Sequence, residues 1–157
     1  VGGQLLWNKF AVAKPLDKGL HQIQGVETVN WQEDGKTGIM SIEITLNKVD
    51  NLQKTYREIN AAAQRALGRK PFRVVLKDNR TPELENKYYQ LHFLIQEAIQ
   101  TGNYSAMAEK VVKQAGTEDI EAKVYVDDGA VFLQLVKAED ALNVVVPRRS
   151  NHQEVRQ

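Results

Sequence analysis

The chain has 157 residues, of which 42% are hydrophobic and 26% are charged, a composition typical of an ordinary globular protein. Its 21 Lys and Arg residues nearly balance its 20 Asp and Glu residues, so the net charge of +1 excludes any overall attraction to nucleic acid or acidic lipid. Cysteine is absent, which excludes disulfides, thiolate metal sites and cysteine nucleophiles within this sequence.

The sequence begins with an apolar segment. Residues 1–7 read Val-Gly-Gly-Gln-Leu-Leu-Trp, and Trp is enriched where membrane helices meet water. Because the first residue is Val rather than Met, we interpret this segment as juxtamembrane-like, with a membrane anchor upstream. The alternative is that Leu5, Leu6 and Trp7 simply pack on the folded protein.

The residues up to Lys77 are expected to form one αββαβ unit. Asp34-Gly35 favours a tight hairpin turn between two alternating segments, and Asp50 and Gly68 are good caps for a helix. The expected elements are a helix over 15–24, a hairpin over 26–46, a helix over 51–67 and a strand over 72–77.

The second half is expected to form an ααβββ unit. Thr81-Pro82 is a helix start, and Phe93 and Leu94 broaden the apolar face of the helix that follows, so we expect this helix to be covered on more than one side. The expected elements are helices from 82 to Gly102 and from Tyr104 to Gly116, then strands over 120–126, 130–136 and 142–146.

We therefore predict an α+β fold of two small sheet-and-helix units, in which antiparallel hairpins pack on helices. The boundaries are residues 1–80 for the αββαβ unit, which includes the juxtamembrane-like segment, and residues 81–149 for the ααβββ unit. Residues 150–157 are polar and are expected to fray.

Residues that could support catalysis are scattered. His21, His92 and His152 lie in three separate segments, and no two of them have the spacing of metal ligands. The sequence contains no Gly-rich phosphate loop, no Gly-x-Ser-x-Gly elbow and no His-Glu-x-x-His helix. We predict no catalytic residue, no metal site and no cofactor, hence no enzyme; an unfamiliar hydrolase or transferase stays open, because sequence alone does not show which polar groups converge.

One segment is locally basic. Between residues 65 and 80, only Asp78 opposes six cationic residues. Such a run favours a nucleic-acid surface, but cations also stabilise a helix C-terminus and protect an edge strand from aggregation. A KH-type RNA module would need a Gly-x-x-Gly loop between two helices, and Gly68-Arg69-Lys70-Pro71 does not supply one. The cations are Arg65, Arg69, Lys70, Arg73, Lys77 and Arg80.

The order of elements resembles that of ring-building modules from bacterial secretion and sporulation assemblies. The segments Ser41 to Leu46, Asn51 to Tyr56 and Phe72 to Leu76 also look like the strand, helix, strand unit of the alkaline-shock and membrane-anchor proteins of Gram-positive bacteria. The resemblance is one of architecture, covers about two thirds of the chain and includes no diagnostic motif. It implies an ectodomain of a membrane-anchored protein that packs side by side with others.

The leading hypothesis is a non-catalytic ectodomain on the extracytoplasmic face of a bacterial membrane, which associates with a protein partner or with itself. The alternative is a nucleic-acid-binding module that uses residues 65–80. Exposed strand edges at 72–77 and 142–146 are the expected contact points, because an unpaired edge accepts another strand. The candidate interaction residues are Arg69, Lys70, Arg73, Lys77, Tyr125 and Gln134.

Overall fold

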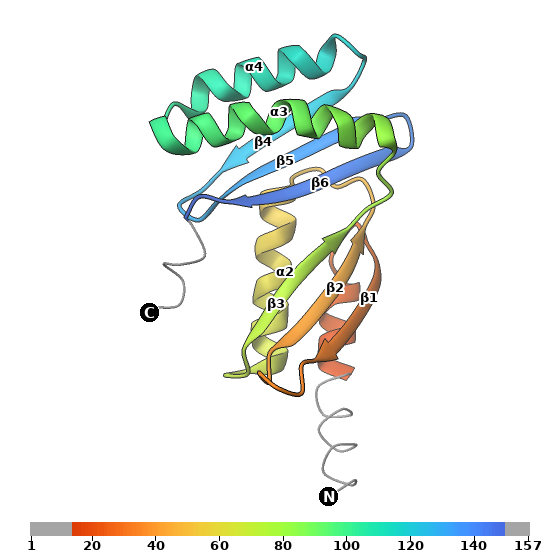
Figure 1. Ribbon diagram of the computed structural model, residues 1–157. Helices are drawn as coiled ribbons and strands as arrows, with labels where there is room; N and C mark the ends of the chain where they lie inside the picture. Colours follow the sequence, from red (N-terminus) through yellow and green to blue (C-terminus); the bar gives the residue numbers. More distant parts are fainter. Residues whose placement is uncertain (1–13, 150–157) are drawn as a thin grey trace, which may run out of the picture. The chain divides into compact units, whose positions relative to one another are not determined.

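The structure, a computed structural model, describes residues 14–149 and divides into two compact units on either side of the Lys77–Asp78 bond (Figure 1). Each unit combines helices with a three-stranded sheet, so the predicted α+β class is confirmed. The apolar opening segment and the polar tail lie outside the described residues, so the expectations about them stay predictions.

The first unit has the predicted αββαβ order. Strand β2 lies in the centre of the sheet, antiparallel to β1 and parallel to β3. A parallel pair needs a crossover connection, and α2 supplies it. The elements are helical residues 14–21, β1 (Val26–Glu33), β2 (Met40–Leu46), α2 (Leu52–Leu67) and β3 (Phe72–Lys77).

The two faces of this sheet differ in burial. Figure 1 shows both helical segments of the unit on the same side of the sheet. Alternate residues of β2 are buried, among them Ile42 and Ile44 with no exposed surface, whereas Glu43 between them is exposed. The period of two therefore places the apolar residues under the helices and the polar residues on an open face.

Local details of the first unit differ from the predictions. The first helix ends at residue 21, three residues earlier than expected, and the chain turns before Gly25. Asn51, not Asp50, caps α2, because its side-chain oxygen accepts a hydrogen bond of 3.0 Å from the backbone N–H of Lys54. The β1–β2 loop is wider than a two-residue turn: the backbone N–H of Asp34 donates to the carbonyl of Ile39 at 2.9 Å, and the N–H of Gly38 donates to the carbonyl of Asp34 at 2.8 Å.

The second unit has the predicted ααβββ order. Its three strands form an antiparallel meander in the order β4-β5-β6, and the β4–β5 connection is a tight turn at Asp128-Gly129. Helices α3 and α4 lie over one face of the sheet (Figure 1). The elements are α3 (Pro82–Thr101), α4 (Tyr104–Gly116), β4 (Glu121–Val126), β5 (Ala130–Lys137) and β6 (Asp140–Pro147).

The core of the second unit lies between these helices and the sheet. Leu91 and Ile95 of α3 and Val111 of α4 are completely buried against residues of β5 such as Leu133. The outward side of α3 is open, because Phe93 keeps 77% of its surface exposed. The helix contacts both α4 and the sheet, so the expectation that it is covered on more than one side is confirmed for Leu94, which packs against the core, but not for Phe93.

The start of the second unit is fixed by two side chains that precede α3. Asp78 accepts a hydrogen bond of 2.9 Å from the backbone N–H of Asn143, and Asn79 accepts one of 3.1 Å from that of Ala141. Residues 78 and 79 thus belong with β6, and the division falls just before them instead of at the predicted residue 80.

Candidate interaction surface

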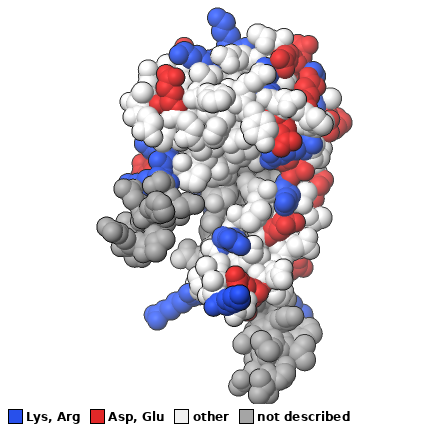
Figure 2. Space-filling model, in the orientation of Figure 1, with Lys and Arg blue, Asp and Glu red and all other residues white. Residues whose placement is uncertain are grey.

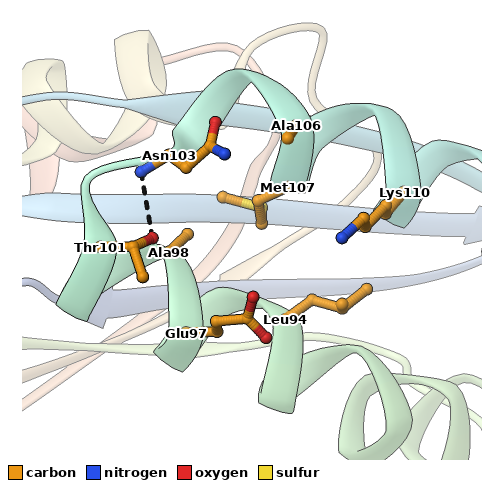
Figure 3. Close-up of a pocket in the computed structure, with 8 residues that line it drawn as sticks. All are labelled: Leu94, Glu97, Ala98, Thr101, Asn103, Ala106, Met107 and Lys110. Atoms are coloured by element: carbon orange, nitrogen blue, oxygen red, sulfur yellow. Dashed lines mark hydrogen bonds between the residues drawn. The ribbon is translucent and has the colours of Figure 1, made fainter.

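A small pocket lies between α3 and α4. It encloses about 30 Å³, which is room for about two water molecules. Figure 3 shows the side chains around it, and the hydrogen bond drawn there runs from the backbone N–H of Asn103 to the hydroxyl oxygen of Thr101 at 3.2 Å. The lining residues are Leu94, Glu97, Ala98, Thr101, Asn103, Ala106, Met107 and Lys110.

The two described histidines make local contacts. Nδ1 of His21 lies 2.9 Å from the carbonyl oxygen of Asp17, one helical turn earlier. Nδ1 of His92 lies 3.2 Å from the hydroxyl of Tyr88, and burial raises the pKa of that phenol. Within residues 14–149 no group of three or more His, Asp or Glu side chains is arranged to hold a metal ion.

The outer edge of β3 is open. Met40 donates its backbone N–H to the carbonyl of Pro71 at 2.9 Å. With the register of the pair, this bond shows which residues of β3 direct their backbone groups toward β2. In a parallel pair, successive residues direct their backbone groups alternately toward and away from the neighbouring strand. The residues whose backbone groups face outward are Phe72, Val74 and Leu76. Within residues 14–149 these outward groups have no further strand beside them.

The side chains of β3 give this edge two distinct faces. Arg73 and Lys77 are exposed on the open face of the sheet, with the half-buried Val75 between them. On the helix side, Phe72, Val74 and Leu76 are also half-buried. We call this strand, with its outward backbone groups and these side chains, the β3 edge.

The remaining cations of the basic run are partly neutralised. Lys70 forms an ion pair of 2.8 Å with Glu33, and Arg80 forms one of 2.8 Å with Asp78, whose hydrogen bonds raise the pKa of the guanidinium. Arg69 is exposed. On the face drawn in Figure 2, Lys and Arg are interspersed with Asp and Glu, which weakens the case for a phosphate-binding surface.

The second expected edge, on β6, is partly closed. The N–H groups of Ala141 and Asn143 donate to the side chains of Asn79 and Asp78, and Asn79 also donates to the carbonyl of Glu139 at 3.0 Å. The prediction of a free edge over 142–146 is therefore wrong for its first half. The sequence carried no clear signal of this, because Asp78-Asn79 has the composition of an ordinary turn.

The two candidate residues of the second unit are not equally accessible. Tyr125 and Gln134 lie on the face of the sheet opposite the α3–α4 core, as alternation predicts. Tyr125 is half-buried, and Gln134 keeps only 1% of its surface exposed. Alternation assigns a residue to a face of a sheet, and it does not tell whether that face is exposed.

The structure therefore gathers Arg73 and Lys77 on one open strand edge, with Lys70 and Arg69 just before it, and leaves Tyr125 and Gln134 in the other unit. None of the helices described between residues 14 and 149 combines the length and apolar character needed to cross a bilayer. Comparison of the chain with protein-family models, with curated proteins and with solved structures finds no match.

Proposed function

We propose that this chain is a non-catalytic ectodomain of a membrane-anchored bacterial protein and that it acts in protein association or scaffold assembly. The observation that carries the proposal is the β3 edge, where outward backbone groups have no strand beside them among the described residues. Such an edge binds an extended segment of a neighbour through main-chain hydrogen bonds.

The contrast between the two sheets supports this choice of surface. In the second unit, Asp78 and Asn79 already occupy part of the outer edge of β6. In the first unit, no comparable side chains cap β3 among the described residues. A partner strand would therefore meet less competition at β3 than at the first half of β6.

A photo-crosslinking experiment in cells tests the proposal. A photoreactive amino acid at Lys77 should capture a protein partner or a second copy, whereas the same group at Arg65, exposed on α2, should not. Equal yields from the two positions, or none from Lys77, would contradict association through the β3 edge. Crosslinks to RNA or DNA at Lys77 would instead support the nucleic-acid alternative.

A proline substitution tests the role of the backbone. Val74→Pro removes an outward N–H without removing a β2–β3 hydrogen bond, so strand β3 should persist as an edge strand. Association should be lost in Val74→Pro and retained in Val74→Thr, which keeps the N–H. If circular dichroism shows that Val74→Pro is unfolded, the crosslinking comparison above still decides the question.

The membrane anchor and the extracytoplasmic location form a separate part of the proposal. They rest on the apolar residues 1–7 and on the architectural resemblance described above. Fractionation of the full-length gene product tests this part: the protein should remain with the membranes and be cleaved by protease added from the extracytoplasmic side. Recovery in the cytoplasmic fraction would overturn the location and leave the β3 edge to be judged by crosslinking.

A further inference from the structure

The β3 edge carries a charge pattern that is suited to one class of partner. We infer that it binds an extended segment of another protein with acidic side chains four positions apart, separated on that face by an uncharged residue. The inference rests on the proposed function, because it names the partner of the same surface.

The spacing of the two cations is the basis of this inference. Arg73 and Lys77 point to the same face of the sheet, and within residues 14–149 neither forms an ion pair, although the charge of Asp34 acts on Arg73 from a greater distance. For an antiparallel partner, their positions are non-hydrogen-bonded pairs, in which opposing side chains are closest. Carboxylates on the partner strand opposite these positions would lie within reach of both cations.

The helix side of the edge sets the rest of the pattern. Phe72, Val74 and Leu76 alternate with the cations and are only half-buried. A partner residue opposite each of them would cover apolar surface that β3 now leaves exposed. The matching segment therefore has apolar side chains on one face. Its other face carries two acidic side chains with one uncharged side chain between them.

The same charges disfavour pairing between two β3 strands. In an antiparallel pair of two β3 strands centred on Val75, Arg73 of each copy would lie opposite Lys77 of the other. The pair would therefore contain two repulsive contacts between like charges. Glu43 on β2 is opposite Val75 and diagonal to both cations, and the charge of Asp34 acts weakly on Arg73, so the two positive charges are only partly offset. A separate acidic segment fits the edge better than a second copy.

Peptide binding tests the inference. The probe is the fluorescent peptide Val-Glu-Val-Thr-Val-Glu-Val, extended by Gly-Ser at each end, which has the same pattern in either strand direction. Two matched peptides carry Gln or Lys in place of both Glu residues. The Glu peptide should bind about tenfold more tightly than the Gln peptide, and the Lys peptide should bind most weakly.

Variants of the chain assign the preference to the named residues. Arg73→Glu combined with Lys77→Glu should reverse the order of the Glu and Lys peptides, and Glu43→Gln should tighten binding of the Glu peptide. Arg65→Glu, on exposed α2, is the control and should leave the order unchanged. The advantage of the Glu peptide over the Gln peptide should shrink as salt rises from about 0.05 M to about 0.5 M.

The outcomes separate the inference from the proposed function. Equal binding of the three peptides, no binding of the Glu peptide at about 1 mM, for which even a weak interface would show binding, or an unchanged order in the double variant would overturn the inference. Crosslinking at Lys77 would still stand in those cases. Absence of crosslinking at Lys77 overturns the proposed function whatever the peptides do.

Discussion

The carboxylate of Asp78 accepts a hydrogen bond of 2.9 Å from the backbone N–H of Asn143, which is 65 positions further along the chain. The same carboxylate accepts two hydrogen bonds from the guanidinium of Arg80, at 2.8 and 2.9 Å, and its side chain is only 1% exposed. One buried side chain thus ties the segment before α3 to strand β6.

We expect Asp78→Ala to lower the free energy of unfolding of the second unit by about 2–3 kcal/mol, because it leaves a strand N–H and a guanidinium without their charged acceptor. Urea denaturation measures the loss, and hydrogen exchange at the amide of Asn143 should become faster. Glu109→Ala, on the exposed side of α4, should change stability by less than about 0.5 kcal/mol. Equal effects of the two substitutions would contradict a structural role for Asp78.

Gly25→Ala should destabilise the first unit by about 2–4 kcal/mol, since the new methyl group adds overpacking to backbone strain. Gly25 has φ +94°, and an added Cβ would lie 2.5 Å from Cγ1 of Val49. Gly35 has no positive φ and no atom within 4 Å of an added Cβ, so Gly35→Ala is the control. Thermal unfolding of both variants should show a large shift for the first and little change for the second.

Leu91 and Phe93 test the assignment of the two sides of α3. Leu91 is completely buried in the core of the second unit, whereas Phe93 is 77% exposed. Leu91→Ala should cost about 2–5 kcal/mol of unfolding free energy, because it leaves a cavity in the core. Phe93→Ala should cost less than about 0.5 kcal/mol. A large loss in urea denaturation for Phe93→Ala would show that the outer side of α3 is covered.

The β1–β2 loop contains a contact of Asp34 that should weaken when its carboxylate is protonated. The backbone N–H groups of Lys36 and Thr37 donate to the carboxylate of Asp34 and hold its pKa below the ordinary value of 3.8. Because the folded pKa is the lower one, this contribution to stability is complete above 3.8 and is lost as the pH falls through the folded pKa.

An NMR titration of the side-chain carboxyl carbon of Asp34 should therefore have its midpoint below 3.8. The amide signals of Lys36 and Thr37 should shift with the same midpoint, since their N–H groups lose a charged acceptor on protonation. In Asp34→Asn this transition should disappear from both amides. A midpoint at or above 3.8 would contradict the contact.

Much of the local structure could be predicted from short-range patterns. Alternation located β1 to β4, and apolar residues three and four apart located α2, α3 and α4, because each period follows from the geometry of the element itself. Thr81 and Pro82 start α3 as expected, with the hydroxyl of Thr81 accepting from the N–H of Leu84 at 3.3 Å. Each of these signals spans only a few residues.

The two Asp-Gly dipeptides show that short-range patterns do not determine the length of a turn. Asp128-Gly129 forms the tight turn between β4 and β5, but Asp34-Gly35 belongs to a wider loop. In that loop the side chain of Asp34 binds the N–H groups of Lys36 and Thr37, so the chain continues for several more residues before β2 begins. The same dipeptide is compatible with both outcomes.

The sequence by itself determined the kind and order of the elements, because hydrophobic periodicity and caps act over a few residues. Only the tertiary structure decided which edges and faces are accessible: it leaves the edge of β3 open, closes part of the edge of β6 with Asp78 and buries Gln134. Accessibility depends on groups far apart in the chain, such as Asp78 and Asn143, and no short-range pattern records which distant groups will meet.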